Sequence, residues 1–548
     1  MPGGEGYRVA QVQFPGGVET TDVLIIGFGA AGTAAAITAR ESGAEVIAVD
    51  RANGGGATAI SGGIIYAGAG TDIQRQAGVH DTAEQMLAYL RLEVGDAVTP
   101  ETLERFVRTS PEMIDWLQGN GVPFDATLCP YKTSYPNNRY YLYYSGSENA
   151  GAFRAHTPPV QRGHRAKGRG ASGKKIYAPL AASARARGVD FRPHTAVTEL
   201  VQDPATGRVL GVQARTMARA PRHIRRMYTA LNALSSKPGI YYPPLRVAAD
   251  RMIAALERRY GQPMQILARR AVIVCAGGFV ANRELLAEHA PAFGAGMPLG
   301  TSGDDGSGIA LAQRAGAVTD RMDNVSAWRF ITPASAFNSA ILVDQAGRRI
   351  IDETRYGAAI GGALVRNHGG KGWLLADATL MAQARGQFFA QSLWFQQAQS
   401  AVLMLTGRVR RRSLADAARA AGIDADGLIA TVDEYNRAID TGAPDPAGKA
   451  AEFCRRIDRG PFTLLDVSVR PNPLYPTPML TLGGVRVCED TGAVLDADGA
   501  PIPGLFSAGR TAIGICSESY VSGLSIADCV FAGRRAGASA AAEPPHPG

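Results

Sequence analysis

The sequence predicts an α/β fold from three observations close to its amino terminus. An apolar run ends in the pattern Gly27-x-Gly29-x-x-Gly32, a helical run over 30–41 follows, and Asp50 closes the next apolar run. In a βαβ unit the first glycine makes the tight turn, the second lets a pyrophosphate approach the backbone, and the third lets the helix pack on its strand. The acid can then accept a hydrogen bond from a ribose hydroxyl. We interpret this segment as a Rossmann-like unit that binds FAD or NAD.

Length and composition indicate a large globular protein. A chain of 548 residues is too long for one compact core, so two or three domains are expected. The composition, 46% hydrophobic and 19% charged, is typical of globular proteins. The net charge of +8 comes from 57 basic residues, mostly arginine, that are spread along the chain. This pattern does not favour a nucleic-acid partner.

The cysteines and the apolar runs predict a reduced, cytoplasmic protein. No CxxC pair or metal-ligand spacing is present, no signal peptide precedes the first strand, and no apolar run has the length of a membrane-spanning helix. We therefore expect no metal, and any membrane contact would be peripheral. The six cysteines are Cys129, Cys275, Cys454, Cys488, Cys516 and Cys529.

Two further glycine-rich segments are candidates for the same cofactor site. The loop 54–63 has almost no bulky side chains, so a flat ligand could lie against its backbone; a flexible linker is the alternative. After helix and strand patterns over 177–215, a buried apolar run at 270–275 leads into Gly277 and Gly278. A second glycine-capped strand fits a sheet that borders the cofactor.

Residues 216–268 form what we interpret as a basic insertion. Arginines dominate the segment, with only Asp250 and Glu257 as acids, and apolar residues are interspersed among them. This pattern allows an interfacial membrane helix, an oligomer contact or a solvated basic arm. The residues alone leave these alternatives open.

The pattern along the chain suggests three parts. Residues 1–284 hold the first part of the dinucleotide-binding domain, and 285–475 mix helices with strands such as 340–344, which predicts a separate α+β cap. Residues 476–548 return to the first domain. The Ala- and Pro-rich tail from about 538 is expected to be disordered.

Five ordered motifs together resemble the succinate dehydrogenase and fumarate reductase flavoprotein superfamily. The resemblance covers roughly residues 20–540 apart from the insertion. It implies an FAD-binding domain of the glutathione-reductase type that is interrupted by the cap. The motifs are Gly-x-Gly-x-x-Gly with Asp50, Ala276-Gly277-Gly278, Gly303-Asp304-Asp305-Gly306, Gly483-Gly484 and Ser507-Ala508-Gly509.

The same resemblance indicates how the flavin is held. The branch with covalent flavin needs a His in the loop 54–63, which has none, so FAD should be noncovalent. Arg510 stands where a Glu is common in the superfamily, which leaves the ribityl contacts there undefined.

Within the superfamily, the segment 519–537 most resembles the 3-ketosteroid dehydrogenases, particularly those that introduce the 4-double bond into 5α-reduced 3-ketosteroids. Their Tyr-x-Ser-Gly motif corresponds to Tyr520, Ser522 and Gly523, and Tyr356 matches the position of a second catalytic tyrosine in the cap. The resemblance implies a small apolar ketone as substrate and an external electron acceptor.

Dicarboxylate reductases of the superfamily differ at two places. They carry Arg where Tyr520 stands and His just ahead of the double glycine, because two cationic groups must bind two carboxylates. Residues 470–490 contain no His. Fumarate and succinate are therefore poor candidates for the substrate.

Desaturation beside a ketone needs a base for the α-proton, a donor to the carbonyl, and flavin N5 to take hydride from the β-carbon. Tyr520 is the candidate base, and its phenolate must be favoured by a nearby donor or positive dipole. Tyr356 and Ser522 could assist or relay the proton. A helix that begins near Ser525 would point its free amides at the flavin, and Gly523 allows the approach.

The predicted contacts of FAD come from all of these motifs. His164 could touch substrate or flavin, but a hydrogen-bonded loop histidine is the alternative that we favour. The predicted FAD-contacting residues are Gly27, Gly29, Ala30, Ala31, Gly32, Asp50, Arg51, Ala57, Thr58, Ser61, Gly62, Gly63, Val197, Ala276, Gly277, Gly278, Asp304, Gly306, Gly509, Gly523, Ser525 and Ile526.

The predicted function is an FAD-dependent dehydrogenase that forms a carbon–carbon double bond beside the ketone of a 3-ketosteroid or similar cyclic ketone. Two alternatives stay open at this point. The first is an ene-reductase of an activated alkene on the same fold, since proton and hydride placement are the same in reverse. The second is a noncatalytic flavin-binding subunit that docks through the basic insertion.

Overall fold

A large sheet carries the dinucleotide-binding half of the molecule. The computed structural model describes residues 18–472 and 474–546. The sheet has the strand order β19-β20-β9-β1-β2-β6, and its central pairs β20–β9–β1–β2–β6 are all parallel. Its strands are β1 (Val18–Ile26), β2 (Val46–Asp50), β6 (Asp190–Pro193), β9 (Gln262–Val274), β19 (Ala493–Leu495) and β20 (Pro501–Ser507).

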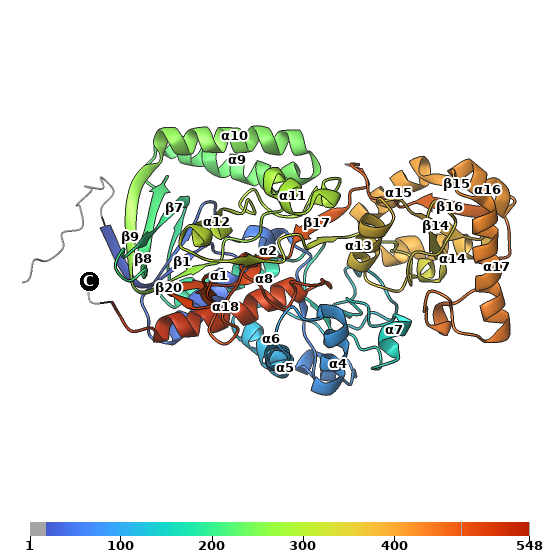
Figure 1. The fold of residues 1–548 in the computed structure, drawn as a ribbon, viewed down its shortest axis with the longest axis horizontal. Helices are drawn as coiled ribbons and strands as arrows, with labels where there is room; N and C mark the ends of the chain where they lie inside the picture. Colours follow the sequence, from blue (N-terminus) through green and yellow to red (C-terminus); the bar gives the residue numbers. More distant parts are fainter. Residues whose placement is uncertain (1–17, 473, 547–548) are drawn as a thin grey trace, which may run out of the picture.

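Two helices from opposite ends of the chain pack together on this sheet. Helix α1 (Ala30–Glu41) contacts α18 (Leu524–Ala542) along its length (Figure 1). The approach is close because Gly533 and Gly537 of α18 face the carbonyl groups of Ala31 and Ala35, where any Cβ would collide. The first and last parts of the sequence therefore form one domain, and the predicted α/β fold is confirmed.

The carboxyl-terminal helix is longer than predicted. Composition indicated a disordered tail from about 538, but α18 continues to Ala542, and Ala540 and Ala541 are buried. The carbonyl groups of Ala541 and Glu543 both accept hydrogen bonds of 2.9 Å from the Arg270 guanidinium. Small alanines suit this close packing, so the prediction of disorder was wrong for 538–542. Residues 547 and 548 lie outside the described residues.

The basic insertion is a helical hairpin. Strands β7 (Thr195–Gln202) and β8 (Val209–Thr216) precede it, and α9 (Arg222–Tyr241) and α10 (Pro243–Tyr260) form it (Figure 1). Residues 262–268, which we assigned to the insertion, belong instead to strand β9 and pair with β1 and β8. The reading as a solvated arm was also wrong, because Met217, Ala220, Ile224, Tyr228 and Ile253 form a small buried core under the helices.

The cap is built on an antiparallel sheet at the other end of the molecule (Figure 1). Its order is β13-β14-β16-β15, and separate apolar clusters cover its two faces. Its elements are β13 (Ile341–Val343), α13 (Gly357–Asn367), β14 (Trp373–Ala376), α14 (Ala378–Gln391), α15 (Trp394–Thr406), β15 (Arg408–Arg411), α16 (Leu414–Ala421), α17 (Ala425–Thr441) and β16 (Phe462–Asp466).

Shorter elements connect these two halves. Helix α12 (Ser307–Arg314) lies in the range predicted for the cap, yet its Ile309 and Ala312 pack against the large sheet. The small strands are β3 (Ile64–Tyr66), β4 (Leu142–Tyr143), β5 (Gly163–Arg165), β10 (Met297–Pro298), β11 (Thr319–Asp320), β12 (Val325–Ala327), β17 (Pro478–Thr481) and β18 (Gly484–Val485). The remaining helices are α2 (Gly56–Ile60), α3 (Asp72–Gln76), α4 (Ala83–Val94), α5 (Pro100–Arg108), α6 (Ser110–Gly119), α7 (Gly151–Arg154), α8 (Lys174–Ala186) and α11 (Arg283–His289).

Three features of the described residues bear on the predicted class of protein. None of their helices combines the length and the apolar character needed to cross a bilayer. All six cysteines are free thiols. Within 18–472 and 474–546, no cluster of three or more His, Cys, Asp or Glu side chains is arranged to hold a metal ion.

Candidate active site

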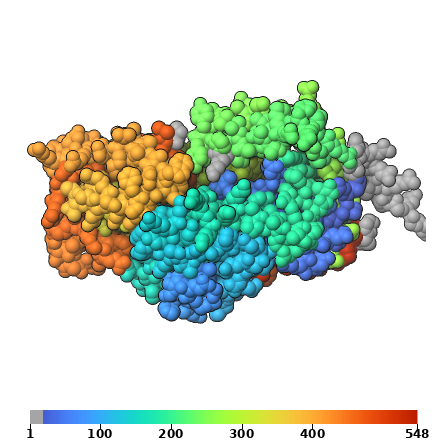
Figure 2. Space-filling model, turned by 180° about the vertical axis from the view of Figure 1, so that it is seen from behind, coloured from blue at the N-terminus to red at the C-terminus, as the bar shows by residue number. Residues whose placement is uncertain are grey.

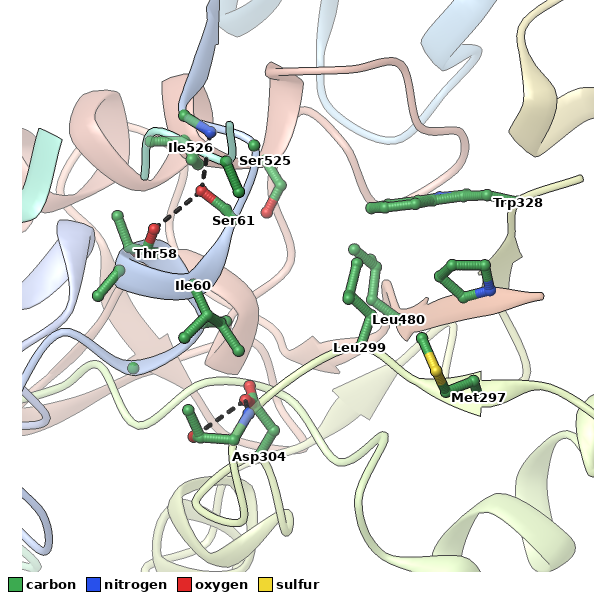
Figure 3. A pocket seen from close by; sticks show the side chains of 18 of the residues that line it. Thr58, Ile60, Ser61, Met297, Leu299, Asp304, Trp328, Leu480, Ser525 and Ile526 are labelled. Carbon is green, nitrogen blue, oxygen red and sulfur yellow. Dashed lines mark hydrogen bonds between the residues drawn. The ribbon is translucent and has the colours of Figure 1, made fainter. Parts of the chain in front are cut away.

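One cavity of about 1010 Å³ connects the large sheet with the cap (Figure 3). Its volume is at the upper end of the range for ligand pockets, roughly 300–1,000 Å³. Most residues predicted from the sequence line it. These are Gly27, Gly29, Ala30, Ala31, Asp50, Arg51, Ala57, Thr58, Ser61, Gly62, Gly63, Val197, Ala276, Gly277, Asp304, Gly509, Gly523, Ser525 and Ile526, together with Tyr356, Tyr520 and Ser522.

Three predicted glycines do not line the cavity. A Cβ at Gly32 would collide with the carbonyl of Gly27, so this glycine permits close helix packing, as the motif predicts. Gly278 donates its amide to Asp304 Oδ1 at 3.4 Å, and Gly306 caps helix α12 with a φ of +82°. These three residues shape the site from behind, and direct contact with a cofactor is not expected of them.

The turn at the end of β1 leaves an open space at the backbone. Gly27 has a φ of +92°, and a Cβ there would strike the carbonyl of Cys275. A Cβ at Gly29, in contrast, would meet nothing nearer than 3.8 Å. Gly29 is also the N-cap of α1 and contributes no side chain to cap it. The free space and the amino end of the helix together form a site for an anionic group such as a pyrophosphate.

Asp50 is held by the backbone around it. Its Oδ2 accepts from the Phe28 amide at 2.9 Å, and its Oδ1 accepts from the Ala52 amide at 2.8 Å. Burial raises the pKa of the Asp50 carboxyl above its usual value, and these hydrogen bonds oppose that rise. Each carboxylate oxygen keeps a lone pair for a further donor, so a ribose hydroxyl could still bind.

The α9–α10 hairpin closes the cavity beside Asp50, which the sequence did not reveal. The Arg51 guanidinium donates to both oxygens of Glu257 in α10, at 2.8 and 2.9 Å. Tyr228 Oη in α9 donates to Glu257 Oε1 at 2.7 Å and lies 2.8 Å from the Arg51 carbonyl oxygen. Asn232 and Glu257 line the cavity. The hairpin is therefore fastened to the residue that follows Asp50.

Asp304 and Arg510 form an ion pair at the centre of the cavity wall. Asp304 also accepts from the Thr301 amide at 2.8 Å, which fixes the turn before α12 (Figure 3). The Nη1 atom of Arg510 is buried without a hydrogen-bond partner among the described residues. It has no surface open to the cavity and lies beside Gly278, so it is a buried, unpaired donor behind the cavity wall, and such a donor costs free energy.

The opposite end of the cavity is an aromatic cluster. The Tyr520 ring stacks on Trp328, with centroids 5.0 Å apart and planes at 14°. Tyr356, at the start of α13, lies 6.1 Å from Tyr520 between ring centroids, and Phe330 lies 5.7 Å from Tyr356. Trp328 stands across the cavity from Thr58 and Ser61 (Figure 3). The two predicted catalytic tyrosines are therefore neighbours.

Trp328 was missed by sequence reasoning. It follows the short strand β12 and belongs to no motif, and its indole nitrogen donates to Ser326 Oγ at 2.8 Å. Its type was the one available signal, because the chain has four tryptophans and a large aromatic side chain is common in ligand pockets.

The tyrosine pKa values differ from what the sequence reasoning required. Burial raises the pKa of Tyr520 above its usual value, although the Gly523 amide and the positive charge of Arg510 oppose the rise. Burial also raises the pKa of Tyr356. Both phenols are therefore neutral near pH 7. The expected donor is present as the Gly523 amide, and the Arg510 charge acts in the same direction, but burial outweighs both.

Ser522 connects the tyrosines to a third phenol. Tyr143 Oη donates to Ser522 Oγ at 3.2 Å, and a hydrogen bond to Ser522 partly opposes the raised pKa of Tyr356. Tyr143 is fully buried. Tyr143 thus supplies a polar contact behind the aromatic cluster.

The amino end of α18 faces the same cavity. Gly523 is its N-cap with a φ of +94°, no side chain caps it, and its first turn holds no acid. Ser525 and Ile526 in this turn line the cavity. The uncapped start of α18 and the open glycine turn before α1, where Thr58 Oγ1 already accepts from the Ala30 amide at 3.2 Å, leave further amides for a pyrophosphate and an electron-accepting ring, so these residues fit FAD.

His164 lies outside the cavity. It sits in β5, fully buried, with Nε2 2.8 Å from Thr71 Oγ1 and Nδ1 3.0 Å from the Arg162 carbonyl. Burial lowers the pKa of His164 to about 4. It is a neutral, hydrogen-bonded residue of the core, in keeping with the alternative that the sequence favoured, although on a strand rather than in a loop.

Comparison with known proteins agrees with this geometry. Residues 22–523 match the family described as "FAD binding domain". A 3-oxo-5-alpha-steroid 4-dehydrogenase of Comamonas testosteroni is 35% identical over 90% of this chain and 92% of its own length. A fumarate reductase (cytochrome) of Shewanella frigidimarina is 25% identical over 95% of this chain and 77% of its own.

A solved structure resembles the whole chain. The 3-ketosteroid-delta4-(5alpha)-dehydrogenase of Rhodococcus jostii RHA1, in complex with 4-androstene-3,17-dione, superposes with a TM-score of 0.79 at 28% identity. The match covers 98% of this chain and 99% of the other.

Proposed function

The chain belongs to the FAD binding domain family, within the succinate dehydrogenase and fumarate reductase superfamily, and from this premise we propose that it desaturates a 3-ketosteroid or similar cyclic ketone next to the carbonyl. It is an FAD-dependent oxidoreductase of the ketosteroid dehydrogenase kind. The observation that carries the proposal is the aromatic cluster at Tyr520, where dicarboxylate reductases of the superfamily have an arginine.

The surroundings of Tyr520 suit a flat apolar ligand. Trp328 and Phe330 line the cavity beside it, and Leu480 and Met297 line the wall below (Figure 3). The relatives from Comamonas and Rhodococcus are named for their action on 3-ketosteroids. An apolar ketone would bury its rings here and place its carbonyl near the hydroxyl groups of the cluster.

The residues of the chain handle the proton. Bound FAD supplies the hydride acceptor at N5, and the residues around the cavity orient the substrate toward it. Tyr520 takes the α-proton as its phenolate, which is the minor form near pH 7 because burial raises the pKa of this phenol. Tyr356 and Ser522 assist, and the phenol of Tyr520 returns the proton to solvent before the next turnover. An external electron acceptor is required to complete each turnover.

We propose that FAD is held without a covalent bond. The loop 54–63 has no His, and the side chains of Thr58 and Ser61 are hydrogen-bonded within the protein. Acid precipitation should therefore release all yellow flavin into the supernatant. Flavin retained in the pellet would contradict this proposal. We also propose a cytoplasmic site of action, to be checked by cell fractionation.

Flavin spectroscopy without oxygen tests the reaction and its direction. A panel of 5α-reduced 3-ketosteroids and simpler cyclic ketones is mixed with the oxidised enzyme, and the matching enones with the reduced enzyme. Bleaching by a saturated ketone supports the dehydrogenase. Reoxidation by enones, with no bleaching by any ketone, supports the ene-reductase instead. Steady turnover with an artificial acceptor would exclude a noncatalytic subunit.

A further inference from the structure

The α9–α10 hairpin exposes an unusual amount of apolar surface. Of the twelve large apolar side chains that are exposed among the described residues, five lie on these two helices and a sixth, Tyr242, lies between them. Their exposed fractions range from 37% to 60%. We call this surface the hairpin face, and its apolar members are Met227, Leu234, Tyr241, Tyr242, Val247 and Met252. An apolar patch of this kind marks an interaction site more often than ordinary surface.

The helical spacing places these residues on the outer side of the hairpin. In α10, Val247, Arg251 and Arg258 are exposed at spacings of four and seven residues, which is one helical face, and the exposed Met252 lies at the side of this face. Ile253, on the other side of the same helix, is buried in the hairpin core. In an ordinary surface helix the solvent side is polar, so this mixture of apolar residues and arginines is typical of a helix that lies in a membrane interface.

Five arginines of the hairpin have no ion-pair partner among the described residues. Arg222, Arg225, Arg226, Arg251 and Arg258 form no ion pair with any described residue. The two acids of the hairpin are already engaged. Glu257 binds Arg51, and Asp250 accepts from Ser235 Oγ at 2.6 Å and lies 3.9 Å from Arg246.

The positive charge of the hairpin indicates which kind of partner covers the hairpin face. A second copy related by two-fold symmetry would place the same arginines opposite one another, and like charges across an interface weaken it. An anionic lipid surface complements them, while the apolar side chains enter the boundary between headgroups and acyl chains.

The cavity reaches the surface beside the hairpin face. Tyr241, at the tip of α9, and Phe389, in α14, line the cavity, yet they are 51% and 75% exposed. In Figure 2 the molecule is hollowed between the hairpin and the cap. An apolar ligand that left a bilayer at the hairpin tip would therefore meet the mouth of the cavity without crossing water.

We propose that the hairpin face docks on an anionic phospholipid membrane and that the substrate passes from the lipid into the cavity. The attachment is independent of the proposed function, whereas the route of the substrate rests on it. The hairpin would lie in the plane of the membrane surface, because no helix of the described residues can span it.

Vesicle flotation with the FAD-loaded enzyme tests the attachment. Vesicles of phosphatidylcholine alone are compared with vesicles that also contain phosphatidylserine, at low and high salt. We expect the enzyme to float only with the anionic vesicles and to be released by salt. Each arginine near such a surface contributes roughly fivefold in affinity, so Arg251→Gln with Arg258→Gln should weaken binding roughly twentyfold.

A second pair of variants separates the apolar contribution from charge. Val247→Ser with Met252→Ser should also weaken binding, whereas Leu92→Ser, an equally exposed leucine on α4, should not. Val247, Met252 and Leu92 do not line the cavity. Their variants should therefore keep the flavin absorbance of the wild type and its turnover of a ketone that is supplied in solution without detergent, which would show that the site is intact. Failure of the proposed function would appear in that turnover and not in flotation.

Two results would overturn the proposal. The first is equal flotation of the wild type and both double variants, or no flotation at all. The second is concentration-dependent dimerisation in sedimentation experiments that the same double variants abolish, because the hairpin face would then be the contact with a second copy.

Discussion

The two ends of the cavity are built on different principles. The dinucleotide end is formed mainly by backbone groups: the turn at Gly27 and Gly29 and the start of α1 come from one short stretch of sequence. The substrate end is formed by side chains: Trp328, Tyr356 and Tyr520 come from three separate segments and pack together there. The first end can be recognised from glycine spacing, and the second exists only when the cap packs on the FAD-binding half.

This difference also separates the consequences of mutation. A side chain added at the dinucleotide end should expel the cofactor, while a hydroxyl removed at the substrate end should leave the cofactor in place and stop the proton transfer. The predictions below test this separation.

The largest effect is expected for Tyr520→Phe. Loss of a positioned proton acceptor should lower kcat by about 10²- to 10⁴-fold while the bound FAD is retained. Steady-state turnover with an artificial acceptor and the flavin absorbance of the purified protein measure the two properties. Tyr131→Phe is the matched control, because Tyr131 does not line the cavity. Full turnover by Tyr520→Phe would remove this residue from the mechanism.

At the dinucleotide end, Gly29→Val should weaken FAD binding by about a hundredfold, the upper end of the cost of overfilling a closely packed site. The apoprotein should keep its fold, since a Cβ at Gly29 meets no protein atom within 3.8 Å. Fluorescence titration of apoprotein with FAD measures the affinity, and thermal unfolding measures the fold.

Gly32→Ala provides the contrast within the same motif. Its Cβ would collide with the carbonyl of Gly27, so this variant should lose stability even without FAD. If Gly29→Val were also destabilised as apoprotein, the open space at the backbone would not be the reason for the glycine.

The pH dependence of kcat/KM should differ from that of FAD affinity, which again distinguishes the two ends of the cavity. Burial raises the pKa of Tyr520, so its reactive deprotonated form becomes more abundant as pH rises up to that raised value. The ratio kcat/KM should therefore climb by up to about tenfold per unit without levelling near pH 10, the usual tyrosine pKa. FAD affinity should stay flat over the same range. A plateau of kcat/KM near neutral pH would show that another group controls the proton transfer.

The smallest effect is expected at the hairpin contact. Glu257→Gln removes the charge from the ion pair with Arg51 and should increase FAD dissociation roughly tenfold. Release of flavin fluorescence after dilution measures the rate. Arg258→Gln, on the next residue but outside any ion pair among the described residues, should dissociate FAD like the wild type. Equal rates for the two variants would mean that the hairpin does not retain the cofactor.

The sequence predicted the FAD contacts more completely than the substrate end of the cavity. Nearly all of the predicted FAD contacts line one cavity, because most belong to glycine motifs whose backbone geometry is set within a few residues. The pairing of Tyr520 with Tyr356 came from resemblance, and the structure places them together. Trp328 and the bond between Arg51 and Glu257, 206 residues apart, carried no local signal.

The sequence by itself predicted the βαβ unit and a dinucleotide cofactor, FAD or NAD, because glycine spacing acts over short range; the choice of FAD and the place of Tyr520 where relatives have a cation came from the family resemblance. Only the tertiary structure decided that Trp328 stacks on Tyr520, that burial keeps both phenols neutral, and that the basic segment is a hairpin fastened over the cavity. These properties depend on burial, because segments that are far apart in the sequence exclude water from one another only when they pack together.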